Sequence, residues 1–238
     1  MPDTVKRGYV PSDNKEFTEQ IDKLRSAGEE LCYLINRGYQ IKSASTFVGN
    51  HHLLSERQRL ALARSISAED YIRARKQKEI CDISDSVVYI DTFNTVITLE
   101  IAFSGSTLLS CMDGTVRDLA GLRGTYRIID KTDLAVNAIK NILESEHARE
   151  ARFFLDALMS NSGRLAQKIE DIFSGSCVKT ACEVMNDVDR SLYDREKVIT
   201  SDAIILDNCI SWFNLTKRAI QEEIGDYPFV RIMEDMAL

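Results

Sequence analysis

Hydrophobic positions in the first 82 residues recur mostly at the spacing of amphipathic helices. Between residues 12 and 37, apolar side chains return every three or four positions, which predicts one long helix. Ser55 and Gln58 form a capping box, in which each side chain accepts a hydrogen bond from the other residue's backbone N–H, and this predicts the start of a further helix. Residues 39–54 show a mixed pattern and are expected to be mostly loop. The sequence therefore predicts an α-helical N-terminal domain over residues 1–82.

From about residue 83 the pattern changes to short apolar runs that alternate with helical patterns. The apolar runs predict strands over residues 87–90, 107–112, 152–156, 178–184, 197–200 and 209–215. The periodic stretches predict helices over residues 132–146, 162–173 and 215–224. Alternating strands and helices are typical of a parallel sheet covered on both faces. The predicted fold class is α/β: a mainly parallel sheet flanked by helices over residues 83–238, joined to the α-helical N-terminal unit.

Charge divides the chain at the same place. The 238-residue sequence has a net charge of −7, but residues 1–82 contain 14 basic and 12 acidic side chains while residues 83–238 contain 16 and 25. Half of the N-terminal basic side chains lie in residues 57–78. This distribution suits an anionic partner held near a carboxylate site, although a basic helix is slightly more often an ordinary solvated surface.

Other features limit the classes of protein to consider. The composition, 44% hydrophobic and 28% charged, is that of a globular protein, and no apolar run approaches the roughly 20 residues of a membrane span. The N-terminus lacks the apolar segment of a secretory signal, so the expected location is the cytoplasm, away from membranes. The six cysteines form no Cys-x-x-Cys pair and are expected to be reduced thiols, not ligands of a structural zinc. The oligomeric state is left open.

Three predicted strands end in aspartate: Asp91, Asp156 and, two residues after its strand, Asp202. Ligands of open α/β sheets bind outside the carboxyl ends of the strands, so these carboxylates are expected at one edge. Converging carboxylates repel one another, and Mg²⁺ or Mn²⁺ relieves that cost because hard cations take oxygen ligands. Any one of these aspartates is more often the cap of the helix that follows it. The three together are explained equally well by a metal site.

A denser polar cluster follows the second predicted strand, from Asp113 to Arg127. It combines glycines, which let a backbone approach a ligand closely, with Asp118 and several arginines, among them Arg123, which suit phosphate. A surface loop with arginine–aspartate ion pairs explains the same composition equally well. A second cluster, residues 160–164, precedes a predicted helix, whose N-terminus can hold an anion. The candidate substrate-binding residues are Arg117, Arg127, Asn161, Ser162 and Arg164.

His51 and His52 form a pair just before the capping box. Paired histidines in a loop can be metal ligands or a general base, but more often they are polar loop residues or packed imidazoles. The sequence leaves their role, and that of the N-terminal helices, open.

Several motifs resemble one family. Residues 45–64, Ser-Thr-Phe-Val-Gly-Asn-His-His through Arg64, and the later stretches 91–94, 113–121, 124–127 and 160–165 are similar to an uncharacterised, largely archaeal family. In that family a domain of unknown function 434 is followed by a domain of unknown function 5616. The resemblance covers nearly the whole chain and implies no particular activity.

A more distant resemblance concerns chemistry. A hydrophobic strand followed by Asp91 and Asn94 is similar to the opening of NYN-type domains, which are relatives of PIN nucleases, and Val198 to Asp202 resembles a later strand of that superfamily. The resemblance implies that three or four acids bind Mg²⁺ or Mn²⁺ and cleave RNA. Asp91 and Asp202 would be metal ligands, and Asn94 would orient the site. Ala203 stands where NYN domains carry a second acid.

The leading hypothesis is therefore a metal-dependent ribonuclease with a PIN-like α/β domain and RNA as its partner. The expected catalytic residues are Asp91, Asn94, Asp118 and Asp202, and the expected metal ligands are Asp91, Asp156 and Asp202, with the choice between Asp118 and Asp156 as middle acid left open. One alternative is a non-catalytic RNA- or protein-binding scaffold with a degenerate site. Another is a phosphatase, because Asp91 to Thr95 is similar to the Asp-x-Asp-x-Thr opening of haloacid-dehalogenase enzymes, although the amide of Asn94 cannot act as their general acid.

Overall fold

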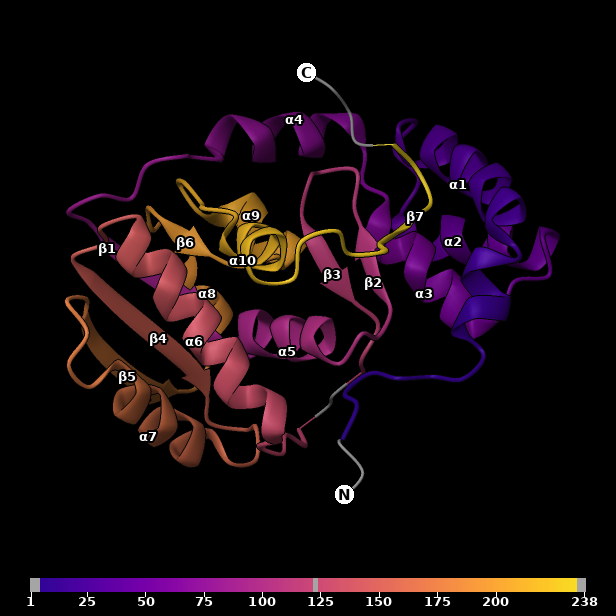
Figure 1. The fold of residues 1–238 in the computed structure, drawn as a ribbon. Helices are drawn as coiled ribbons and strands as arrows, with labels where there is room; N and C mark the ends of the chain where they lie inside the picture. Colours follow the sequence, from indigo (N-terminus) through magenta and orange to yellow (C-terminus); the bar gives the residue numbers. More distant parts are fainter. Residues whose placement is uncertain (1–4, 122–123, 235–238) are drawn as a thin grey trace.

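The N-terminal part of the chain is a layer of helices. The computed structural model describes residues 5–121 and 124–234, and Figure 1 shows the first helices of this layer at one end of the molecule, with the last one, residues 69–78, extending from them across the top. Its elements are a short π-helix η1 (Asn14–Thr18), α1 (Ile21–Ile35), α2 (Ile41–His51), α3 (Glu56–Ser65) and α4 (Glu69–Lys78). The single helix predicted over residues 12–37 is therefore divided between η1 and α1.

Two predictions about this layer have different outcomes. The capping box of α3 is confirmed. The backbone N–H of Gln58 donates to Ser55 Oγ at 3.2 Å, and the backbone N–H of Ser55 donates to Gln58 Oε1 at 3.0 Å. The loop expected over residues 39–54 is wrong, because α2 occupies most of it. The buried face of α2 consists of small or β-branched residues such as Ala44 and Val48, so its apolar signal is too weak to show a helical period.

The main sheet is parallel and four-stranded. Its strands are β1 (Val87–Asp91), β4 (Glu150–Asp156), β5 (Lys179–Met185) and β6 (Val198–Ile199), in the order β5-β4-β1-β6. The helices that follow the strands are α5 (Thr92–Phe103), α6 (Asp130–Ser145), α7 (Ser162–Phe173), α8 (Val188–Leu192), α9 (Ala203–Asn208) and α10 (Leu215–Glu223).

Side chains of the sheet alternate between two hydrophobic cores, as expected for strands with both faces covered. Phe153 of β4 packs with α5, α6, α7 and α10, whereas Phe154 points to the opposite face and packs with α8 and α9. The predicted α/β class, with a parallel sheet flanked by helices and a helical N-terminal unit, is therefore confirmed.

A second, three-stranded sheet connects the two parts of the molecule (Figure 1). It contains β2 (Leu108–Ser110), β3 (Val116–Asp118) and β7 (Val230–Arg231), in the order β3-β2-β7. Leu109, Cys111 and Ile232 from this region complete the core of the N-terminal helices. The strand predicted over residues 107–112 therefore belongs here and not to the parallel sheet. The strand predicted over 209–215 does not form, and Trp212 makes only isolated bridges.

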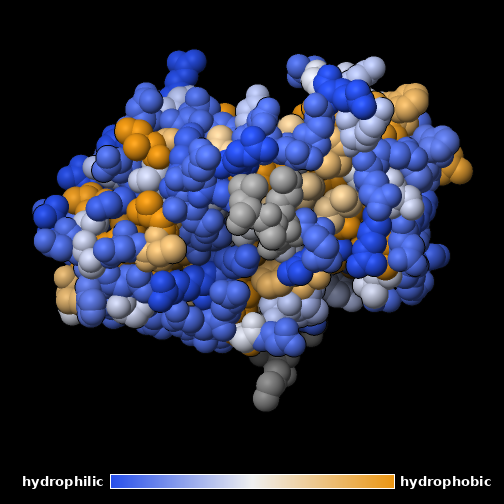
Figure 2. All heavy atoms as spheres, turned by 90° about the horizontal axis from the view of Figure 1, so that it is seen from above, coloured by the Kyte–Doolittle hydropathy of each residue, from blue (hydrophilic) through white to orange (hydrophobic). Residues whose placement is uncertain are grey.

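The face of the molecule that carries α4 is mostly polar. Figure 2 shows that hydrophilic residues cover most of the described part of this face, while hydrophobic residues lie in separate small groups. Among the described residues, every helix is too short or too polar to cross a membrane.

Candidate active site at the edge of the parallel sheet

The order of the strands creates a crevice beside β1. From β1 the chain proceeds to β4 and β5 on one side and then returns to β6 on the other side. Such a reversal leaves a crevice outside the carboxyl ends of β1 and β6, and open α/β sheets bind their ligands at such a position. Asp91 ends β1, and Asp202 follows β6 by three residues. Both strands therefore deliver an aspartate to the crevice.

A cleft of about 550 Å³ lies at this edge and is strongly acidic. The aspartates that line it are Asp91, Asp118, Asp156, Asp187, Asp189 and Asp202. Four of them were expected from the sequence: Asp91, Asp118, Asp156 and Asp202. Asp187 and Asp189 were not, although they follow β5 just as Asp156 ends β4, so the same rule of acids after strands would have found them. The structure thus brings all four predicted aspartates into one cleft.

Asp91 is the most perturbed of these acids. Burial raises its pKa, a hydrogen bond from Thr200 Oγ1 to Oδ2 at 2.9 Å opposes the rise, and the charges of Asp202 and Asp189 add to it, so that the pKa reaches about 7. Asp91 precedes α5 but makes no side-chain capping hydrogen bond to it. The backbone N–H of Asn94, in the first turn of α5, lowers the pKa of Asp91 but is the weakest of these influences, so capping contributes little at this residue.

Asn94 connects the segments that follow β1 and β6. Its side-chain Oδ1 accepts hydrogen bonds from the Ser201 N–H at 2.8 Å and from Ser201 Oγ at 2.9 Å. Asn94 lies in the first turn of α5, and Ser201 lies between β6 and α9. The amide therefore holds the Thr200–Asp202 turn against α5 and fixes the position of Asp202 relative to Asp91.

Asp202 and Asp156 combine a structural role with a place in the cleft. Asp202 caps α9, because its Oδ1 accepts from the N–H groups of Ile204 at 2.8 Å and Ile205 at 3.3 Å. Asp156 Oδ1 accepts from the Leu158 N–H at 2.8 Å, which closes a turn after β4. Each carboxylate has a second oxygen, so capping and metal ligation do not exclude each other.

Asp118 and Arg117 are both held in ion pairs. Arg64 Nη1 lies 3.3 Å from Asp118 Oδ1. The Arg117 guanidinium donates to Asp113 Oδ2 at 2.6 Å, to the Ser201 carbonyl at 2.7 Å and to the Arg64 carbonyl at 2.7 Å. Its charge is directed into the protein and braces the Ser201 turn, so it is placed to support the cleft wall.

The remaining candidates lie outside the cleft. Arg127 and Asn161 line a separate pocket, and Asn161 Nδ2 donates to the Tyr126 carbonyl at 2.7 Å. Ser162 Oγ donates to the Asp156 carbonyl at 2.6 Å and so supports the cleft indirectly. Arg164 is exposed on α7. Arg123 lies outside the described residues.

The basic segment is largely engaged within the protein. Arg57 contacts Asp13 at 2.5 Å, while Arg75 pairs with Asp113 at 2.8 Å and with Asp207 at 2.7 Å. Arg75 therefore binds α4 to the rest of the chain, whereas the Arg57–Asp13 pair lies within the helical layer. Among the basic side chains of this segment, Arg64 is the one that lines the cleft.

Mutual repulsion is the main electrostatic property of the cleft. Burial and the charges of Asp202, Asp187 and Asp156 raise the pKa of Asp189. The donors are hard carboxylate oxygens, which suit Mg²⁺ or Mn²⁺. Within the described chain, Glu30, His51 and His52 form the one group of three or more potential ligands whose atoms all lie within 4.8 Å of one another. Among the described residues, no three acids of the cleft meet this criterion.

Comparison with known proteins places this architecture in a family. Residues 23–78 match a family described as "Protein of unknown function (DUF434)", and residues 80–218 match "Domain of unknown function (DUF5616)". The chain belongs to the family of DUF434–DUF5616 proteins. It is 34% identical over 185 residues to "Uncharacterized protein MJ0935" of Methanocaldococcus jannaschii, a match that covers 77% of this chain and 88% of the relative. No solved structure matches the chain.

The two matched regions contribute different kinds of side chain to the cleft. All six aspartates come from the DUF5616 region, whereas Arg64 and Ser67 enter the cleft from the DUF434 region. His51 and His52 also lie in the DUF434 region. The resemblance to this family, read from the motifs, is thereby confirmed. Neither family description names a nuclease, so the PIN/NYN resemblance stays a prediction.

Proposed function

We propose that the cleft binds Mg²⁺ or Mn²⁺ and that the protein hydrolyses phosphodiester bonds of RNA. The observation that carries the proposal is the position of Asp91: at the end of β1, beside the reversal of strand order, with its pKa raised to about 7 by burial and by neighbouring carboxylates. A chain that concentrates acids at this point raises the energy of its own folded state. A divalent cation would offset that cost.

The chain's residues divide the work as follows. Asp91, Asp156 and Asp202 would hold the cation, because the ion pairs among the described residues do not engage them, whereas Asp118 is paired with Arg64. The bound metal would supply an activated water and neutralise charge on the phosphate. Asn94, through its hydrogen bond with Ser201, fixes the position of Asp202 relative to Asp91. Asp156 is thus the preferred middle acid.

Arg64 supports an anionic substrate. Its side chain is 33% exposed and lies at the edge of the cleft, where it pairs with Asp118. A substrate phosphate would compete with Asp118 for this guanidinium, and Asp118 would then be released toward the cleft. Since most of the other basic side chains of residues 57–78 are turned inward, recognition is expected to rest on the cleft and its rim.

The test is cleavage of a labelled single-stranded RNA by the full-length protein at pH 8 with millimolar Mn²⁺. Wild type is expected to cleave, chelation is expected to stop cleavage, and Asp91→Asn is expected to lower the rate by about 100-fold or more. Asp85→Asn is the matched control: Asp85 lies just before β1 at the opposite edge of the sheet, and its side chain is 88% exposed. Intact RNA after incubation with folded, metal-loaded wild type would contradict the proposal.

A binding scaffold is the second candidate. Its support is the spacing of the acids, which do not form a three-ligand group within 4.8 Å among the described residues, and the inward pairing of the basic segment. Retention of the RNA on the protein without cleavage, unchanged in Asp91→Asn, would favour it. The phosphatase alternative gains no support, because the second acid of those enzymes stands two residues after the first, and that position is occupied by Phe93 and not, as expected above, by Asn94.

A further inference from the structure

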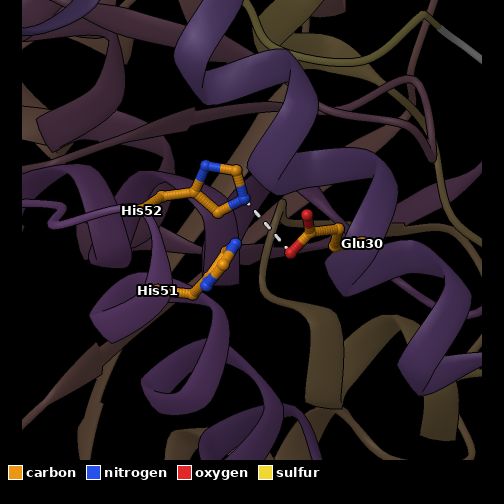
Figure 3. A group of neighbouring side chains, drawn as sticks. All are labelled: Glu30, His51 and His52. Atoms are coloured by element: carbon orange, nitrogen blue, oxygen red, sulfur yellow. Dashed lines mark ion pairs between the residues drawn. The ribbon is translucent and has the colours of Figure 1, made fainter.

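A second cluster of ligand-type side chains lies in the helical layer, away from the acidic cleft. Glu30 belongs to α1, His51 is the last residue of α2, and His52 follows it directly. Figure 3 shows the two imidazoles and the Glu30 carboxylate gathered around one small space. One ligand atom from each residue can be chosen so that all three lie within 4.8 Å of one another.

The contact between His52 and Glu30 has the geometry of two ligands sharing an ion. His52 Nε2 lies 3.1 Å from Glu30 Oε2, yet this buried nitrogen has no partner in hydrogen-bonding orientation. Ligand atoms about 2.0–2.1 Å from a tetrahedral zinc ion are roughly 3.3 Å apart. The observed separation is close to that value, and a shared ion accounts for both the short distance and the unsuitable orientation.

The two imidazoles are arranged so that both can contribute. Their ring centroids are 5.0 Å apart and their planes meet at 88°. Consecutive residues of a regular helix point in different directions, but α2 ends at His51, and the chain leaves the helix at His52. Both rings can therefore reach the same point beside α1.

We propose that Glu30, His51 and His52 bind one Zn²⁺ ion. Two imidazole nitrogens and a carboxylate oxygen are ligands that zinc accepts, whereas Mg²⁺ and Mn²⁺ prefer oxygen-only sites such as the acidic cleft. Glu30 is 47% exposed, so a fourth position is open to water. The site uses no cysteine, and it would fasten the end of α2 to α1.

The experiment is a zinc titration of the full-length, tag-free protein against a chromophoric chelator. Wild type is expected to bind one zinc ion tightly. Glu30→Gln, His51→Asn and His52→Asn are each expected to weaken binding at least about 100-fold, since even residues that only support a ligand change metal affinity by 10–100-fold. His147→Asn, which removes the third histidine of the chain from an exposed position, should leave the affinity unchanged. Asp91→Asn should also leave it unchanged, which separates this site from the cleft.

Thermal unfolding provides a second measurement that does not depend on the chelator. Zinc should raise the Tm of wild type and of His147→Asn, because a ligand that binds only the folded state stabilises it. It should not raise the Tm of the three site variants. Absence of stoichiometric binding by folded wild type, binding retained in His51→Asn and His52→Asn, or binding lost in Asp91→Asn would each overturn the proposal.

Discussion

The Asp91 side chain destabilises the metal-free protein and is also a proposed ligand of the metal. Its carboxylate is partly buried at the end of a β-strand, accepts a hydrogen bond from Thr200 and is repelled by Asp202 and Asp189. Its ordinary pKa is 3.8 and its pKa in the folded protein is about 7, so protons bind more tightly to the folded state. The metal-free protein therefore loses stability as the pH rises from about 4 to about 7.

The first prediction follows from that sign. Asp91→Asn should stabilise the metal-free protein at pH 8 by at most about 4 kcal/mol, because it removes a charge that the folded state holds poorly. The gain should disappear near pH 4. Urea unfolding of both proteins at the two pH values measures it. A variant that is less stable than wild type at pH 8 would show that the carboxylate is not strained there.

The acidic residues at the strand ends could be predicted from the sequence, but the ion-pair and hydrogen-bond partners of the side chains around them could not. Asp91, Asp156 and Asp202 were expected at one edge because each follows an apolar run, and the structure places all three in the cleft. The inward direction of Arg117 could not be foreseen, since it depends on Asp113 and on Ser201, which lies 84 residues away.

At the level of single elements, local signals decided which helices were predictable. The capping box of α3 is a local pattern and was found, and Asp202 was recognised as a cap for α9. The helix α2 was missed because its buried face is made of small residues. The strand β2 was found but assigned to the wrong sheet, because an apolar run does not specify its partner strand.

The second prediction concerns the cap of α3. Ser55→Ala leaves the Gln58 N–H without its acceptor and should lower the free energy of unfolding by about 1 kcal/mol. Ser26→Ala, on the exposed face of α1, is the control and should change stability by less than about 0.5 kcal/mol. Equal effects of the two substitutions, measured by urea unfolding, would contradict the structural role given to Ser55.

At the scale of the whole molecule, one buried acid joins the helical layer to the rest of the chain. Asp113 lies between Arg75 of α4 at 2.8 Å and Arg117 of β3 at 2.6 Å, with only 1% of its side chain exposed. Burial alone would raise the pKa of Asp113, but Arg117, the Thr115 hydroxyl and Arg75 hold it at about 2. This contribution to stability is present above about pH 4 and is lost as the pH falls toward 2.

The third prediction tests that connection. Asp113→Asn leaves the buried Arg117 guanidinium without its counter-ion and leaves Arg75 with Asp207 alone, and it should cost about 3–5 kcal/mol at pH 7. Asp70→Asn removes a 94% exposed partner of Arg73 on the same helix, α4, and should be nearly neutral. Calorimetric unfolding of both variants provides the comparison. A loss below about 1 kcal/mol for Asp113→Asn would mean that the two parts are held together by other contacts.

The order of the strands was the part of the fold least accessible from the sequence. Alternation of strands and helices predicted a parallel sheet, but the return of the chain to β6 on the far side of β1 depends on long-range packing. The same holds for the second sheet, through which Leu109 and Ile232 complete the N-terminal core. The location of the cleft follows from these long-range features, whereas its acidity was already visible in the sequence.

The measurement that tests the account most directly is calorimetric titration of Mn²⁺ into the full-length protein at pH 8. It is best made on His52→Asn and on His52→Asn combined with Asp91→Asn, so that the histidine cluster does not contribute. The account predicts binding in the first protein, weakening by up to about tenfold per unit as the pH falls below 7, because ligation requires the Asp91 carboxylate. It predicts loss of binding in the second. No binding to the folded first protein at millimolar Mn²⁺, or equal binding to both, would contradict it.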